Sequence, residues 1–404
     1  MAFYQKLAAN TLYQVIARVF SSGATFLVTI LVARHFGLTP YGDFAKVTAF
    51  VSLFYLFADF GFNAMFLQKD HSTEHFHDLF YTRIILAVLL VAIVNAITFV
   101  LPYNATTGIG FSPMVRLSIA FFSLTILTES MLYSAFAVFQ RRYIYQKFMW
   151  ATIIGSLTTL FFVCLFLLIH ATLFWTFIAF IVGAVVEAVL SITFTEEKLL
   201  PVVFHVRFAK ELFLETIPVA SMLIFNLVYF NIDTFLLSLF RPSADVGIYN
   251  LAYSVFNFLI ALPLFLSNVL YPKLIVDEKN NRNEIRIVLM YVFRFFSLGI
   301  ITAIIFYFLA PFIFYLIQPS LLPAVLPLRI LLLSLPVFFA TNILQWILLS
   351  KKQQTFLAWI YFSLMILNIV LNLLLIPHFG YIASAIITDA GEFIVLVLFL
   401  LKLL

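Results

Sequence analysis

The stretch from Thr11 to Asn63, TLYQVIARVFSSGATFLVTILVARHFGLTPYGDFAKVTAFVSLFYLFADFGFN, decides the fold of this protein. It contains two apolar spans joined by a short polar connection. Polar residues recur at three- and four-residue steps within each span, so each set lies on one face of a helix. The two faces consist of Thr11, Gln14, Arg18, Ser22, Thr25 and Thr29, and of Thr48, Ser52, Tyr55, Asp59 and Asn63. Two membrane helices that each carry a polar face and a charge are typical of a water-filled cavity in a transporter.

The composition agrees with this interpretation. Hydrophobic residues make up 64% of the 404 residues, and charged residues only 10%. Soluble domains have about 25% charged residues, so the chain is predicted to be an integral membrane protein. The one cysteine, Cys164, excludes an intramolecular disulfide. The histidines are scattered and there is no phosphate-binding glycine loop, so we expect no metal and no cofactor.

Apolar spans of similar length continue through the rest of the chain. A hydrocarbon core ~30 Å thick requires ~20 residues per helix, and we count about twelve such spans. They cover residues 10–33, 43–66, 82–102, 116–139, 147–169, 173–195, 214–240, 247–270, 286–316, 324–349, 356–376 and 380–402. We therefore predict an all-α polytopic membrane protein. Pro311 lies in the ninth span, whose outer end we expect to be broken or interfacial.

Lysine and arginine are distributed unevenly between the connections. The N-terminus, the even-numbered connections and the C-terminus hold sixteen, including Arg83, Arg142 and Lys147. The odd-numbered connections hold five, including Lys46. Cytoplasmic loops of membrane proteins carry such an excess of cations, so both termini are predicted to be cytoplasmic.

The longest connection, about residues 196–213, has mixed charge and contains Pro201. We interpret it as the linker between an N-terminal six-helix lobe, residues 1–200, and a C-terminal six-helix lobe, residues 201–404. A weak internal repeat supports this division. Gly42-Asp43-Phe44 follows the first span and Gly247-Ile248-Tyr249 follows the seventh, at an offset of 205 residues.

Several motifs together resemble a known family. They are Arg34-His35-Phe36-Gly37, Tyr41-Gly42-Asp43-Phe44, Asp59-Phe60-Gly61-Phe62, Asn231-Ile232-Asp233, Gly247-Ile248-Tyr249-Asn250-Leu251-Ala252, and Asn368 and Asn372 with Leu375-Ile376-Pro377-His378-Phe379-Gly380-Tyr381-Ile382-Ala383-Ser384-Ala385. Their order and spacing are similar to those of the polysaccharide-biosynthesis (O-antigen) flippases. That family belongs to the superfamily of multidrug and toxin extruders and lipid II flippases. Ala383 stands where the family usually has a second glycine.

The resemblance implies a function, a location and partners. It implies that the chain moves an isoprenoid-diphosphate-linked (undecaprenyl) oligosaccharide, a polysaccharide or O-antigen (lipopolysaccharide) repeat unit, across the cell inner (cytoplasmic) membrane. It also implies alternating access between two lobes. The expected partners are the glycan lipid, the bilayer, and the polysaccharide polymerase with its chain-length machinery; no nucleic acid and no enzymatic activity are expected.

An anionic diphosphate passing through hydrocarbon needs cations in a solvated groove. Arg18 lies about 12 Å inside the cytoplasmic surface at ~1.5 Å per residue, and Arg294 enters from the same side to a similar depth. One arginine per lobe would suit a diphosphate clamp, with Gln14 beside the first. Two alternatives stay open: Arg18 could form a salt bridge with Asp59, and Arg294 could reach the membrane interface.

Acidic and amide residues inside the spans supply further candidates. The intramembrane acids are Asp59, Glu129, Glu187, Asp233, Asp389 and Glu392. Proton or sodium coupling would need one of them to change its protonation or its ligands, and Asp59, Glu129 and Asp233 are our candidates; structural pairing is the alternative. Asn250, Asn257, Asn368 and Asn372 could line a sugar path or form interhelical hydrogen bonds. Gly37, Gly42, Gly247, Pro377 and Gly380 are predicted to shape turns.

Two other functions remain as alternatives. A cation-coupled multidrug exporter of the same superfamily would favour intramembrane acids without arginines. A membrane-embedded polysaccharide polymerase or sugar transferase would need a sizeable polar loop or paired catalytic groups, which the sequence lacks. Arg18 and Arg294 favour an anionic, phosphate-bearing substrate.

Overall fold

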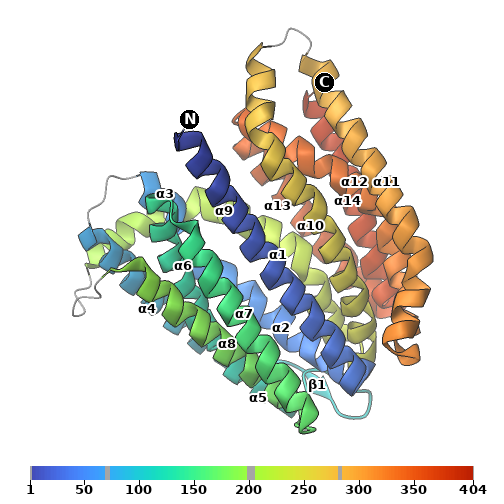
Figure 1. Cartoon of the computed structure of the whole chain (residues 1–404). Helices are drawn as coiled ribbons and strands as arrows, with labels where there is room; N and C mark the ends of the chain where they lie inside the picture. The colour runs from blue at the N-terminus through green and yellow to red at the C-terminus, as the bar shows by residue number, and fades with distance from the viewer. Residues whose placement is uncertain (1, 69–72, 198–204, 281–283, 404) are drawn as a thin grey trace. The chain divides into compact units, whose positions relative to one another are not determined.

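A computed structural model of the chain describes residues 2–68, 73–197, 205–280 and 284–403, and almost all of them are helical (Figure 1). The α-helices are α1 (Ala2–Phe36), α2 (Leu38–Asp59), α3 (Phe62–Gln68), α4 (Thr73–Val100), α5 (Pro113–Phe122), α6 (Thr125–Arg142), α7 (Tyr145–Leu168), α8 (Leu173–Thr195), α9 (Val206–Phe240), α10 (Ser243–Asn280), α11 (Glu284–Ile317), α12 (Val325–Ser350), α13 (Gln354–Phe379) and α14 (Tyr381–Leu403). A 3₁₀ helix, η1 (Pro319–Ala324), precedes α12, and a small hairpin of β1 (Tyr103–Asn104) and β2 (Ile109–Gly110) lies between α4 and α5.

The prediction of an all-α polytopic membrane protein is confirmed. Eleven helical segments of the described chain are long and apolar enough to cross a membrane. The remaining predicted span, residues 43–66, falls on α2 and α3, and α2 carries Asp43, Lys46 and Asp59. The predicted break at Pro311 is wrong, because α11 runs through that residue to Ile317. The cytoplasmic location of the termini stays a prediction.

The chain forms two compact units. Unit 1 comprises Met1–Leu31, Lys46–Ala105 and Phe111–Leu227, and unit 2 comprises Val32–Ala45, Thr106–Gly110 and Val228–Leu404. The division into transport lobes at residues 1–200 and 201–404 stays a prediction, and part of the segment around it, residues 198–204, lies outside the described residues.

Close packing in unit 1 depends on small residues and aromatic rings. Helices α7 and α8 run side by side (Figure 1). A Cβ atom at Gly183 of α8 would lie 1.8 Å from Thr159 Oγ1, so only glycine allows this approach. At one end of the unit, Phe62, Phe66 and Phe76 form a buried cluster with neighbours from α6 and α9.

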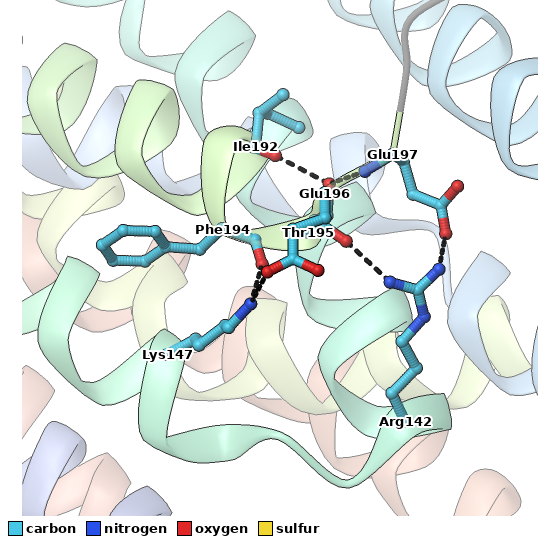
Figure 2. Close-up of polar contacts among 7 residues, drawn as sticks. All are labelled: Arg142, Lys147, Ile192, Phe194, Thr195, Glu196 and Glu197. Carbon is cyan, nitrogen blue, oxygen red and sulfur yellow. Dashed lines mark hydrogen bonds and ion pairs between the residues drawn. The ribbon is translucent and has the colours of Figure 1, made fainter.

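Two cations close the C-terminal end of α8 (Figure 2). Arg142 Nη1 donates to the Thr195 carbonyl at 2.8 Å and its Nη2 pairs with Glu197, while Lys147 Nζ pairs with Glu196. Cations stabilise a helix C-terminus because its free carbonyls carry partial negative charge. The hydrogen bond from Lys147 and its charge lower the pKa of Glu196. This contribution to stability is therefore present at neutral pH and lost as the pH falls through the lowered pKa.

Unit 2 is organised around α12. This helix is mostly buried and packs against α10, α11 and α14. In contrast, α11 exposes large apolar side chains such as Phe293 and Phe308 along most of its length. In a membrane protein such a face contacts lipid, since hydrocarbon solvates it well. Helix α11 is thus the outer helix of this unit and α12 its central one.

The two glycines of the sequence repeat meet in unit 2. A Cβ atom on Gly42 would lie 1.6 Å from the Ser243 carbonyl oxygen, and one on Gly247 would lie 2.3 Å from the Leu38 carbonyl oxygen. The first turns of α2 and α10 therefore touch backbone to backbone. Ser243 Oγ also donates to Asp43 Oδ1 at 2.6 Å. The prediction that Gly42, Gly247 and Pro377 shape turns is wrong, because they lie inside α2, α10 and α13. Gly37 and Gly380 are turn residues with positive φ, as predicted.

We expect Gly42→Ala to lower the free energy of unfolding by about 1–3 kcal/mol, because its Cβ must displace a backbone carbonyl. Thermal unfolding of the purified protein in detergent measures this. Gly23→Ala is the matched control: a Cβ atom there would have no neighbouring atom within 4 Å, so the helix should gain roughly 0.5–1 kcal/mol. Equal melting temperatures for Gly42→Ala and the wild type would contradict the close contact.

Candidate functional site

A buried ion pair forms the centre of the polar site in unit 1. Arg83, in the third turn of α4, is fully buried, and its Nη2 donates to Asp59 Oδ1 at 3.1 Å and to the Asp59 carbonyl at 3.3 Å. The guanidinium lies over the rings of Phe62 and Tyr133, at 5.6 and 6.0 Å from their centroids. Cation–π contacts and the pairing with a partly exposed carboxylate together offset the free-energy cost of burying the charge of Arg83.

This pair corrects two expectations from the sequence. The count of cations assigns Arg83, at the edge of the predicted span 82–102, to a cytoplasmic connection. Helix α4 instead begins at Thr73, nine residues before that span, and carries Arg83 into the interior. The alternative in which Arg18 pairs with Asp59 is wrong, because Arg83 occupies that position. Arg18 itself is exposed, and within the described part of the chain it forms no hydrogen bond or ion pair.

The polar site continues from Arg83 through the interior of unit 1. The Tyr133 hydroxyl lies beside the Glu129 carboxyl, and Glu187 is the next acid along. Tyr55 Oη lies 2.7 Å from Thr125 Oγ1 on the neighbouring α6. Five buried polar atoms of this unit have no partner among the described protein groups: Asn63 Oδ1, Arg83 Nε and Nη1, Ser130 Oγ and Ser191 Oγ. Buried polar atoms normally bind a protein group, water or ligand, so this interior is suited to hold water or an ion.

A second polar site lies in unit 2, where four helices meet at Asp233. Its Oδ2 accepts hydrogen bonds from Thr388 Oγ1 at 2.9 Å and Tyr249 Oη at 3.1 Å, and its Oδ1 accepts one from Asn372 Nδ2 at 3.0 Å. Asn372 Nδ2 also lies 2.9 Å from Asn368 Oδ1. The structure thus brings together three of the predicted residues, Asp233, Asn368 and Asn372, from α9 and α13. All donors to the carboxylate are neutral, so its charge has no compensating cation among the described residues.

The other candidate residues are placed as follows. Asn250 accepts a hydrogen bond from Tyr41 Oη at 2.7 Å. Gln14 is half-buried, and Asn257 and Arg294 are exposed. Arg18 and Arg294 belong to different units, so their action as one clamp stays a prediction. The roles of these residues in binding or coupling stay predictions as well.

Sequence reasoning missed several members of these sites. Arg83 was not recognised as an interior residue because it lies at the edge of an apolar span. Tyr249 and Thr388 complete the Asp233 site from α10 and α14. Tyr249 belongs to the internal repeat and Thr388 follows Ser384 by one helical turn, but neither signal alone indicates a shared carboxylate partner.

Comparison with known proteins places the chain in a family. Residues 7–276, more than half of the chain, match the family described as polysaccharide biosynthesis protein. The chain belongs to this family. Residues 218–374 also match the MatE family. The resemblance to polysaccharide-biosynthesis proteins and multidrug extruders is therefore confirmed. The chain matches no curated protein sequence.

Several solved structures share the fold of this chain. The lipid II flippase MurJ, in an inward closed conformation, is 15% identical with a TM-score of 0.78, over 97% of this chain and 87% of that chain. A multidrug resistance MATE family transporter in an inward-facing conformation is 12% identical with a TM-score of 0.69, over 97% and 93%. A eukaryotic MATE transporter is 15% identical with a TM-score of 0.65, over 100% and 96%. At these identities the likeness establishes the fold.

We expect Arg83→Met to lower the free energy of unfolding by about 3–5 kcal/mol, because removing one partner of a buried pair leaves the other uncompensated. Denaturation of the purified protein measures the loss. The double variant Arg83→Met/Asp59→Asn should recover most of it, since no charge is then left alone. Arg18→Ala is the control and should unfold like the wild type; a stability loss there equal to that of Arg83→Met would contradict the assigned pairing.

Proposed function

We propose that this protein is a flippase that moves an isoprenoid-diphosphate-linked oligosaccharide, a polysaccharide or O-antigen repeat unit, across the cytoplasmic membrane by alternating access. The family match over residues 7–276 carries the proposal. The fold shared with a lipid II flippase supports it, because that protein handles a lipid-linked substrate. We place the chain in the cell inner membrane as a multi-pass protein that supplies repeat units to a polysaccharide polymerase and its chain-length machinery.

Arg18 is the residue that we assign to the diphosphate. It lies in the apolar helix α1, where an exposed arginine is costly unless it faces water or an anion. Its planar fork of donors suits phosphate oxygens, and no described side chain occupies that fork. Gln14 lies one helical turn before Arg18, and Arg294 is an exposed arginine on α11 of unit 2 that we also assign to an anionic substrate.

Coupling to a proton or sodium gradient is assigned to Asp233. Four helices, α9, α10, α13 and α14, donate to or surround this one carboxylate. A change in its protonation or its ligands therefore alters hydrogen bonds on several helices at once, which is what a conformational switch requires. Asp59 is already neutralised by Arg83 and Glu129 lies deeper in the same unit, so they are second to Asp233 as coupling residues.

Export of cationic drugs is the second candidate function. The MatE match over residues 218–374 and the fold shared with multidrug transporters favour it. An exporter of cations would use the acids of both units and would gain nothing from Arg18. Loss of Arg18 should therefore impair a flippase and leave an exporter of cationic drugs unaffected.

In cells that lack this protein, we expect undecaprenyl-linked repeat units to accumulate on the cytoplasmic side of the membrane. Wild type should clear them, and Arg18→Ala should clear them roughly 10–100-fold more slowly, since a charge-assisted hydrogen bond is worth about 1.5–3 kcal/mol. Extraction and quantification of the glycan lipid measure this.

The matched control is Arg207→Ala, which removes an exposed arginine of the same unit whose ion-pair partner, Glu211, lies on its own helix. It should clear the lipid at the wild-type rate. If the glycan lipid never accumulates, the flippase function fails, and sensitivity to cationic drugs becomes the decisive test. If Arg18→Ala clears the glycan lipid at the wild-type rate, Arg18 does not belong to the substrate site.

We further expect Asp233→Asn to abolish the response of transport to an imposed proton or sodium gradient, because an amide cannot change its charge. Flipping in proteoliposomes, with and without the gradient, measures this. The gradient-driven rate should fall to the rate without a gradient. An unchanged ratio of the two rates would assign coupling to another acid.

A further inference from the structure

Helix α11 continues through a proline that removes one of its backbone hydrogen bonds. Proline has no N–H, so Pro311 cannot donate to the carbonyl of Tyr307, one turn earlier in the helix. A backbone carbonyl without a partner is costly inside hydrocarbon. Here the donor comes from the neighbouring helix, because Arg329 Nε of α12 donates to the Tyr307 carbonyl at 3.2 Å. This bond supports α11 at the proline, and the helix runs on to Ile317.

The same contact fixes the orientation of the Arg329 guanidinium. The group lies over the Tyr307 ring, with Cζ 4.5 Å from the ring centroid. The Tyr307 carbonyl thus holds Nε, and the Tyr307 ring holds the flat face of the guanidinium. The terminal nitrogens, Nη1 and Nη2, have no hydrogen-bond or ion-pair partner among the described residues. The guanidinium is therefore fixed on one edge and free on the other.

Arg329 lies where α12 reaches the lipid-facing surface of unit 2. Most of α12 is buried, but Leu326 and Leu333 are 51% and 64% exposed. These leucines stand three residues before and four residues after Arg329, so all three share one face of the helix. On α11, Phe308 follows the contacted Tyr307 and is 73% exposed. A cation therefore lies within an apolar surface that faces lipid.

No acid of the neighbouring helices is placed to neutralise this cation. The sequence has no Asp or Glu between Glu284 and Asp389, so the exposed faces of α11 and α12 carry none beside Arg329. Asp389 itself is buried on α14 and bonds to a hydroxyl of α12. An arginine at a lipid-facing surface is costly unless it reaches water or an anion. Arg329 stands about one turn after the start of α12, where a long side chain can reach the headgroups.

We propose that Arg329 binds the phosphate of a membrane phospholipid at the lipid-facing surface of unit 2. The free edge of its guanidinium presents parallel N–H donors, which match two oxygens of a phosphate. The acyl chains of the lipid lie toward the bilayer centre, along the exposed side chains of Leu333 on α12 and Ile304 on α11. By the predicted topology this lipid belongs to the outer leaflet. The site is separate from the proposed transport function and does not depend on it.

The first test concerns the bond between Arg329 and the Tyr307 carbonyl. Arg329→Gln should lower the melting temperature of the purified full-length protein by about 2–4 °C, because that carbonyl loses its donor. Pro311→Ala restores an N–H to α11, so in this background Arg329→Gln should lower the melting temperature much less. Equal losses in the two backgrounds would overturn the role of Arg329 as the substitute donor.

Lipid binding is measured in the Pro311→Ala background, where the Tyr307 carbonyl has a partner with or without Arg329. The probe is phosphatidylglycerol, added to the delipidated full-length protein in detergent, and native mass spectrometry quantifies the bound molecules. Pro311→Ala/Arg329→Gln should bind the tightest molecule roughly 10–100-fold more weakly than Pro311→Ala does, since a charge-assisted hydrogen bond is lost. Equal affinities of the two proteins would overturn the proposal.

Two controls separate the phosphate from other sources of binding. Diacylglycerol with the same acyl chains lacks the phosphate and should bind equally weakly to both proteins. Lys402→Gln, in the same background, removes another cation of unit 2 that lies over a ring, 5.2 Å from the Phe356 centroid, and should leave the affinity for phosphatidylglycerol unchanged. The proposal is overturned if diacylglycerol distinguishes the two proteins, or if the loss of Lys402 weakens binding as much as the loss of Arg329. No glycan lipid enters these measurements, so their failure leaves the flippase function standing.

Discussion

The structure depends on one constraint: a polar group inside hydrocarbon must find its partner within the protein, because lipid offers none. Backbone groups satisfy this by forming helices almost everywhere in the described chain. Side chains satisfy it in local clusters, and unit 1 and unit 2 each contain one. The positions of these clusters, more than the apolar surface, give the molecule its chemistry.

The two units meet the constraint in different ways. In unit 1 a buried cation, Arg83, is neutralised by Asp59 and lies against aromatic rings. In unit 2 the carboxylate of Asp233 is held by neutral donors from three helices. A salt bridge fixes a charge in place, whereas a carboxylate with neutral partners can exchange a proton or bind a cation with small rearrangements. This contrast is the reason for our proposal that Asp233 of unit 2 is the coupling residue.

The same constraint explains the role of small residues. Interhelical contacts in a membrane gain little from the hydrophobic effect, so they depend on close packing and hydrogen bonds. Gly42 and Gly247 allow α2 and α10 to touch along their backbones, and the Asp43–Ser243 hydrogen bond lies beside this contact. Thus the weak repeat in the sequence corresponds to a physical contact between its two copies.

The sequence by itself determined the class of the protein. The length and apolarity of each span are local properties, and they decide whether a helix can cross a bilayer. The family motifs and the turns at Gly37 and Gly380 could also be predicted from the sequence. The same holds for the position of Asp233, Asn368 and Asn372 inside the apolar spans. Only the tertiary structure decided which polar groups pair. Arg83 bonds to Asp59 across 24 residues, and Thr388 bonds to Asp233 across 155. Such partners are chosen by how helices pack against one another, and neither composition nor periodicity along the chain records that choice.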